Sequence, residues 1–226
     1  MFVQISGLLF LLIIVVLILA SSRYDYEIFS ELDPEAQLQK INKNPKKFKT
    51  GTLMAVLEHF IIIFLAISLF LAFNSYNLIL GVVWLISRGT EGLIQIYNKR
   101  KFLGLLNVAE QYSGASGTEK DALSDSALAI LKSKNSTFSF AQILFSIGTF
   151  AYSIVFVVYE TFPRLTIIGW FGIVASVIYG LGNCAKRVKP NFNALWNLGG
   201  LLIWIFELIL GFWLLYPHPP IPIVPL

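Results

Sequence analysis

Several residue types are scarce in this 226-residue chain, and each scarcity excludes a class of site. The sequence has a single cysteine, Cys184, so it contains no intramolecular disulfide framework and no zinc site built on paired thiolates. It has only two histidines, His59 and His218, which are too few for a histidine-rich metal site. The sequence therefore predicts neither a metal centre nor a cofactor.

Charged residues are also scarce, whereas apolar residues are abundant. Charged residues make up 13% of the chain and hydrophobic residues 56%, while a soluble domain is about a quarter charged. The apolar residues form six runs that approach or exceed the 20 or so residues a helix needs to cross the hydrocarbon core. The runs cover 2–20, 54–73, 76–97, 138–159, 165–184 and 194–216. The sequence thus predicts an all-α integral membrane bundle of six transmembrane helices, formed by residues 1–216.

The basic residues predict the orientation of this bundle. Fifteen of the seventeen Lys and Arg residues lie in three connections, 21–53, 98–137 and 185–193. The positive-inside rule predicts that these connections are cytoplasmic loops and that the N-terminus and C-terminus lie outside. The net charge of +4 is then a topology signal and no sign of nucleic-acid binding. The tail 217–226, with five prolines in ten residues, is predicted to lie outside as well.

Two of the predicted loops contain helical signals of their own. In the first loop, Asp33 is a predicted N-cap and Pro34 the first residue of a short surface helix that ends before Asn44. The basic run 43–51 behind it suits either contact with anionic lipid headgroups or a topology signal alone. In the loop 98–137, we expect a helix from Thr118 to about residue 132.

Polar or small residues recur at helical spacing in four of the six spans. In the span 76–97, Arg88 and Glu91 fall on one helix face, opposite an apolar face. The four stripes are 81, 84, 88, 91 and 95; 139, 142, 146, 149 and 153; 169, 172, 176, 180 and 183; and 193, 197, 200, 204, 207 and 211. Because polar side chains avoid lipid, we expect these stripes to face the interior of the bundle.

The charges expected in this interior do not balance. Arg88 is accompanied by three carboxylates, those of Glu58, Glu91 and Glu207, which leave a net charge of −2 if all are ionised. A bare charge at the bilayer centre costs at least about 2.5–3.5 kcal/mol. At least one carboxyl group is therefore expected to hold a proton, meet water, or bind a cation or ligand. The predicted ligand-binding residues are Arg88, Glu91, Glu58, Glu207, His59, Trp84, Gln95, Gln142 and Trp204.

Catalytic signals are weak in this sequence. The pair Glu58-His59 is compatible with acid–base chemistry, but neighbouring helical residues point about 100° apart and do not readily address one atom. No recognisable nucleophile triad, phosphate-binding loop or metalloprotease motif is present. The sequence therefore favours a protein that is not an enzyme, with a lipid-modifying enzyme as a lesser alternative.

The chain resembles a family of six-span bacterial and archaeal membrane proteins known only as a domain of unknown function. The resemblance rests on Arg88-Gly89-Thr90-Glu91, on Phe162-Pro163-Arg164, on Glu207-Leu208 and on Trp213-Leu214-Leu215. The family tends to place a glycine close behind the Pro-Arg pair, whereas here Gly169 follows Arg164 by five residues. The resemblance implies a six-helix bundle in a prokaryotic cell membrane and implies no activity.

Two interpretations of the polar interior follow from the sequence. In the first, the protein binds or transports a small ligand, cation or proton in a polar cavity within the membrane. In the second, the protein has a structural or assembly role, and the same residues form a buried Arg–Glu network that specifies helix packing. The expected partners are the lipid bilayer, the small ligand or cation, and a second copy of the chain.

Overall fold

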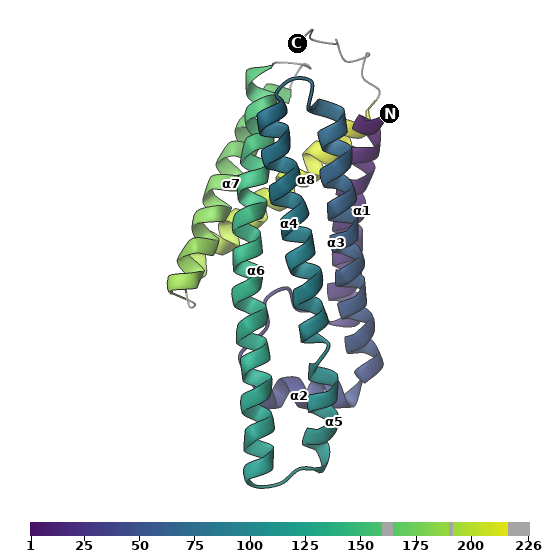
Figure 1. Ribbon diagram of the computed structural model, residues 1–226, viewed down its shortest axis with the longest axis vertical. Coiled ribbons are helices and arrows are strands. Elements are labelled where there is room, and N and C mark those ends of the chain that lie inside the picture. The colour runs from purple at the N-terminus through teal and green to yellow at the C-terminus, as the bar shows by residue number, and fades with distance from the viewer. Residues whose placement is uncertain (160–164, 190–191, 217–226) are drawn as a thin grey trace. The chain divides into compact units, whose positions relative to one another are not determined.

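The computed structural model describes residues 1–159, 165–189 and 192–216. All the regular secondary structure of these residues is helical (Figure 1). The eight helices of the described residues are α1 Phe2–Tyr24, α2 Pro34–Lys43, α3 Pro45–Phe73, α4 Leu78–Phe102, α5 Leu105–Gly114, α6 Thr118–Val158, α7 Leu165–Val188 and α8 Ala194–Leu215. The prediction of an all-α protein is confirmed.

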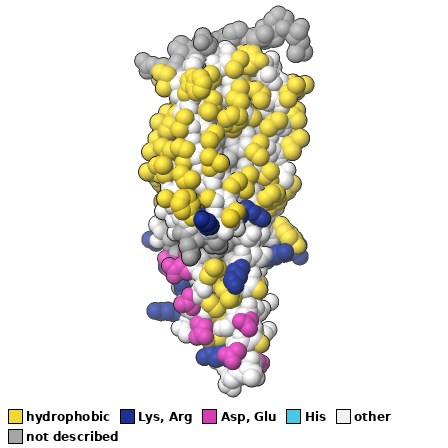
Figure 2. All heavy atoms as spheres, turned by 90° about the vertical axis from the view of Figure 1, so that its left-hand side faces the viewer, with side chains coloured by type: hydrophobic (Ala, Val, Ile, Leu, Met, Phe, Trp, Pro, Cys, Tyr) yellow, Lys and Arg dark blue, Asp and Glu magenta, His cyan; other side chains and the backbone are white. Residues whose placement is uncertain are grey.

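Six helices of the described chain are long and apolar enough to cross a membrane. Five of them are α1, α3, α6, α7 and α8. The sixth is the stretch Leu78–Gly114, which contains both α4 and α5. Side chains such as Ile86 and Leu93 on the predicted outer face of α4 are exposed, and Figure 2 shows a face with extensive hydrophobic cover. A soluble protein does not expose apolar surface on this scale, so the chain is a multi-pass membrane protein.

Two helices are longer than the sequence analysis predicts. The expected break near residue 132 is wrong, because α6 runs without interruption from Thr118 to Val158. This helix contains no proline and a single glycine, Gly148, so nothing in its sequence ends it. In addition, the basic run expected in a loop begins α3 at Pro45, where the side chain of Asn44 accepts a hydrogen bond from the Lys47 amide at 3.0 Å.

The chain forms two compact units. The first unit comprises residues 1–14, 60–93 and 139–226, and the second comprises 15–59 and 94–138. Four helices, α1, α3, α4 and α6, contribute residues to both units.

Glycines bring the helices of the first unit into backbone contact. A Cβ atom added at Gly199 of α8 would lie 2.5 Å from the Cα of Tyr179 in α7, and one at Gly182 of α7 would lie 2.7 Å from the amide nitrogen of Trp196. Gly7 of α1 faces the backbone of α8 in the same way, at 2.7 Å from the carbonyl oxygen of Gly211. Packing this close lets membrane helices gain dispersion energy where lipid offers no hydrophobic driving force.

The second unit has a small apolar core beneath the two short helices. Helix α2 packs on α5, and the core includes Leu38, Leu105 and Leu131, all fully buried. The predicted N-cap of α2 is confirmed, because the Asp33 carboxylate accepts a hydrogen bond from the Ala36 amide at 3.0 Å. This cap fixes the start of α2 and therefore the end of the preceding segment 25–33.

Neighbouring glycines of α8 give a matched test of the backbone contact. We expect Gly199→Ala to lower the free energy of unfolding by about 1–3 kcal/mol, because the new methyl group overlaps the α7 backbone. Gly200→Ala should raise it by up to about 1 kcal/mol, because its Cβ would lie 3.7 Å from the Tyr179 ring, an ordinary van der Waals contact, and alanine favours the helix. Unfolding of the purified protein in mixed micelles measures both, and equal effects would contradict the contact.

Candidate functional site

The centre of the first unit contains a buried ion pair within one helix. Arg88 and Glu91 of α4 are each 1% exposed, and the guanidinium donates a hydrogen bond to the Glu91 carboxylate at 2.7 Å. The spacing of three residues places both side chains on one face of the helix, as the sequence analysis predicts. The pairing offsets the desolvation free energy of each buried charge, because each lies at contact distance from the opposite charge.

Aromatic rings and a glycine complete the surroundings of Arg88. The carbon at the centre of the guanidinium lies 4.2 Å from the ring centroid of Phe145 in α6 and 5.4 Å from that of Trp84. A Cβ at Gly148 would lie 3.1 Å from the Arg88 Cγ atom, so the arginine stem fills the space that this glycine leaves. The ring faces favour the cation where water is excluded. Arg88 is thus held in one orientation by packing as well as by charge.

Glu207 of α8 approaches the same guanidinium but is held far less well. Its carboxylate oxygen lies 4.0 Å from an Arg88 terminal nitrogen, and its side chain is 10% exposed. It accepts no hydrogen bond from the residues that the structure describes, whereas Glu91 receives one. Tyr179 of α7 lies within electrostatic range of all three charged groups. The site therefore holds one arginine, one well-paired carboxylate and one carboxylate in loose contact.

The other predicted site residues of the first unit differ in their placement. Trp84 is buried, and its indole N–H donates to the carbonyl oxygen of Ala66 in α3 at 3.0 Å. Gln142 is buried on α6. Trp204, in contrast, is 39% exposed, and the stripe predicted for α8 is wrong at Asn193, Asn197 and Trp204, all exposed. The buried face of α8 instead contains large apolar residues such as Phe206, because packing selects shape as well as polarity.

Glu58 and His59 belong to the second unit, where they contact each other. The His59 Nδ1 atom lies 2.6 Å from the Ala55 carbonyl oxygen and 3.4 Å from the Glu58 carboxylate. Because both neighbours are acceptors, Nδ1 carries a proton and donates it. Burial, followed by the nearby charge of Glu58, raises the pKa of Tyr26 above its ordinary value, so this phenol stays neutral.

Gln95 and two lysines form a polar cluster in the second unit that the sequence analysis recognises only in part. The Gln95 side-chain oxygen accepts a hydrogen bond from the Lys99 ammonium at 2.8 Å, and both side chains are buried. The Asn98 amide donates to the carbonyl oxygen of Lys134 at 3.1 Å, which ties α4 to α6. Helical spacing places Gln95 on the polar stripe of its span, whereas no periodic pattern in the sequence indicates that Lys99 and Lys134 are buried.

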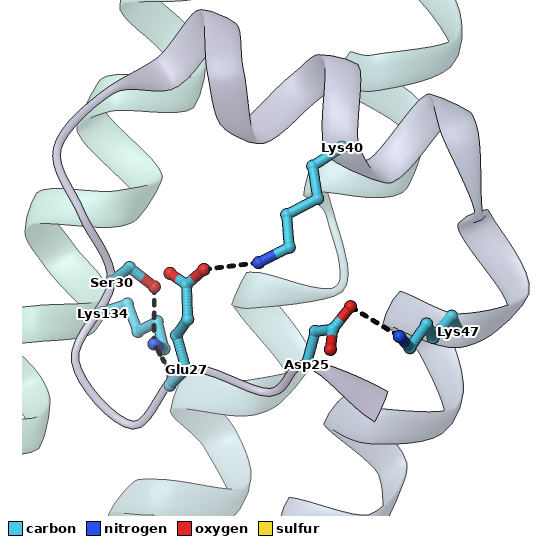
Figure 3. Close-up of polar contacts among 6 residues, drawn as sticks. All are labelled: Asp25, Glu27, Ser30, Lys40, Lys47 and Lys134. Atoms are coloured by element: carbon cyan, nitrogen blue, oxygen red, sulfur yellow. Dashed lines mark hydrogen bonds and ion pairs between the residues drawn. The ribbon is translucent and has the colours of Figure 1, made fainter. Parts of the chain in front are cut away.

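Lys134 holds the segment 25–33 against α6 (Figure 3). Its ammonium donates to the Glu27 carbonyl oxygen at 2.6 Å and to the Ser30 hydroxyl at 2.6 Å, and it lies 4.6 Å from the Phe102 ring centroid. Asn135, the next residue, exchanges two hydrogen bonds with the Ser30 backbone at 2.7 and 2.9 Å. One turn of α6 therefore fixes a segment that has no regular structure of its own.

The described residues contain no group of three or more His, Cys, Asp and Glu side chains that could hold a metal ion. Arg88 lies close to both Glu91 and Glu207 and opposes a divalent cation there. Phe162-Pro163-Arg164, His218 and the proline-rich tail 217–226 lie outside the described residues.

Comparison with known proteins identifies one match. The model of a family described as "Domain of unknown function (DUF4386)" matches residues 5–216. No curated protein and no solved structure matches the chain.

The unequal pairing of the two carboxylates predicts unequal effects of their removal. Glu91→Gln should lower the free energy of unfolding by about 3–5 kcal/mol, because it leaves the buried Arg88 without the countercharge at contact distance. Glu207→Gln should change it by less than about 1 kcal/mol, because it removes a contact of 4.0 Å without a hydrogen bond. Denaturant unfolding in micelles measures both, and a larger loss for the Glu207 variant would contradict this geometry.

Lys134 gives a second prediction, because its loss leaves acceptors of the segment 25–33 without a donor. We expect Lys134→Met to cost about 1–3 kcal/mol and to speed hydrogen exchange at residues 26–30. Lys132→Met is the matched control, since this exposed lysine lies on the same helix and loses the same charge. Hydrogen exchange read by mass spectrometry tests the prediction, and equal exchange in both variants would refute the role of Lys134.

Proposed function

The chain belongs to the DUF4386 family of unknown function, and we propose that it binds a proton or small cation at Glu207 inside the membrane. This binding is proposed to be part of transport. One observation carries the proposal: Glu207 is a nearly buried carboxylate that accepts no hydrogen bond from the described residues and only approaches Arg88, at 4.0 Å. A carboxylate left so poorly solvated gains greatly from a proton or a monovalent cation.

The balance of charge at the site supports the same proposal. Arg88 is already committed to Glu91 at 2.7 Å, so ionising Glu207 as well gives the site a net charge of −1. Removing that charge requires one positive equivalent, which a proton or monovalent cation supplies. The residual exposure of the Glu207 side chain, 10%, gives such a small species access to the carboxylate.

Transport adds to binding the requirement that the site reach both sides of the membrane. The proposed location is the cell membrane of a prokaryote. Both termini are proposed to lie outside, which the distribution of Lys and Arg supports. A species bound at Glu207 then weakens the attraction between α8 and Arg88 of α4, which gives the protein a difference in energy between loaded and empty states.

A structural role is the second candidate, and one observation favours it. The Arg88 stem packs against Gly148 and its guanidinium against Phe145, so packing as well as charge holds the arginine in place. In this case, Glu207 only helps to select the position of α8, and its carboxyl group holds a permanent proton.

Infrared difference spectra of the protein in lipid distinguish the two candidates. We expect the carboxylic-acid band of a buried glutamate to change on a pH step or on addition of sodium or potassium, and to vanish in Glu207→Gln. Glu35→Gln, which removes an exposed carboxylate of α2, should leave that band intact. A band that belongs to Glu207 and ignores both pH and cations would overturn the proposal and favour the structural role.

Flux measurements separate binding from transport. With protein in sealed vesicles, we expect a proton or cation gradient to decay faster than in protein-free vesicles, and Glu207→Gln to remove the difference. Glu35→Gln should retain it. A gradient unaffected by the wild-type protein, together with a responsive infrared band, would limit the function to binding.

A further inference from the structure

The second unit contains a cavity of about 430 Å³ where two membrane-crossing helices meet α2. Its walls come from the last residue of α1, from the C-terminal half of α2 and from the first turn of α3. The lining residues include Tyr24, Asp25, Lys40, Lys43, Asn44, Lys47 and Phe48. The proposed cation site involves none of them.

Three lysines give the cavity a positive charge that the protein only partly compensates. Lys40 pairs with Glu27 at 2.7 Å and Lys47 with Asp25 at 2.6 Å, both drawn in Figure 3. Lys43 makes no ion pair with any described residue. Each ammonium carries three donor hydrogens, so one contact apiece leaves Lys40 and Lys47 with hydrogens for another acceptor.

The backbone at the cavity is close to neutral. Asn44 lies where α2 ends and α3 begins, so the partial negative charge of one helix end and the partial positive charge of the other offset each other there. The preference for an anion therefore comes from the side chains. Asp25, the only acidic residue in the lining, is bound by Lys47, whose hydrogen bond lowers the pKa of the Asp25 carboxyl below its ordinary value. The cavity therefore offers an anion two partly engaged lysines and one unengaged lysine.

The helices that form the cavity indicate where its ligand comes from. Tyr24 ends the apolar helix α1, and Phe48 lies in the first turn of the apolar helix α3. Tyrosine at the end of a membrane-crossing helix is typical of the level of the lipid headgroups. A phosphate at this level belongs most directly to a membrane phospholipid, whose chains follow the exposed apolar surface of the same helices.

We propose that this cavity binds the phosphate of an anionic membrane phospholipid, with Lys43 as its principal cationic contact and Lys40 and Lys47 beside it. The site differs from a general basic surface in one respect that can be measured. Lys46 and Lys49 belong to the same basic run and are exposed, yet neither lines the cavity. Replacing Lys43, Lys46 or Lys49 changes the net charge equally, but of these three only Lys43 should matter for a bound headgroup.

Native mass spectrometry of the protein released from nanodiscs tests the site. With phosphatidylglycerol diluted in phosphatidylcholine, we expect the wild-type protein to retain phosphatidylglycerol and Lys43→Gln to bind it about fivefold more weakly. Lys46→Gln should retain it as the wild type does. Equal losses in the two variants, or no loss in either, would overturn the proposal and leave only a basic surface.

A variant that should bind more strongly serves as a further test, because misfolding can explain a loss of phosphatidylglycerol binding but not a gain. Asp25→Asn removes the carboxylate that competes for Lys47, so it should strengthen phosphatidylglycerol retention. Asparagine also tolerates the left-handed backbone of this residue, whose φ is 52°. Unchanged or weaker retention in this variant would count against the cavity.

Competition with soluble anions separates the two sources of phosphate. We expect inorganic phosphate and glycerol 3-phosphate, at concentrations well above that of the lipid, to leave phosphatidylglycerol bound. Displacement by either anion, with the same dependence on Lys43, would show a site for a soluble phosphate compound and would overturn the assignment to lipid.

Discussion

The guanidinium of Arg88 imposes the strictest requirement on this protein, because it carries a permanent charge through the middle of an apolar bundle. A charge at that depth costs at least about 2.5–3.5 kcal/mol. Glu91 supplies the hydrogen-bonded countercharge from the same helix, and the Phe145 ring supplies a polarisable face from α6. The helices that contribute to the site therefore cannot be exchanged or rotated without exposing a bare charge.

The glycines and the charged site depend on each other. Gly148 leaves the space that the Arg88 stem fills, and the contact between Gly199 and Tyr179 sets how closely α8, which carries Glu207, approaches α7. Such contacts fix distances between helices to within a fraction of the length of a side chain. The 4.0 Å separation between Arg88 and Glu207 follows from this backbone packing, whereas the 2.7 Å pair with Glu91 follows from helical spacing alone.

This difference explains how much the sequence could predict. The length of an apolar run and helical periodicity are local properties, so they identified the six apolar helices and placed Arg88 and Glu91 on one helix face. The buried face of α8 depends on which large side chains fit between neighbours, and a rule based on polarity misplaced Trp204. Lys134 was missed as a buried residue for a similar reason, since its acceptors lie about 105 residues away in a segment without periodic structure.

The lysines of the second unit show that a topology signal and a specific role are compatible. The positive-inside rule counts Lys43, Lys47 and Lys134 alike, because only their charge affects insertion. In the folded unit they differ: Lys134 binds backbone carbonyls, Lys47 binds Asp25, and Lys43 engages no carboxylate among the described residues. Pairing most of these cations internally reduces general attraction to anionic lipid. The charge that remains uncompensated at the cavity is then the one that can select a ligand.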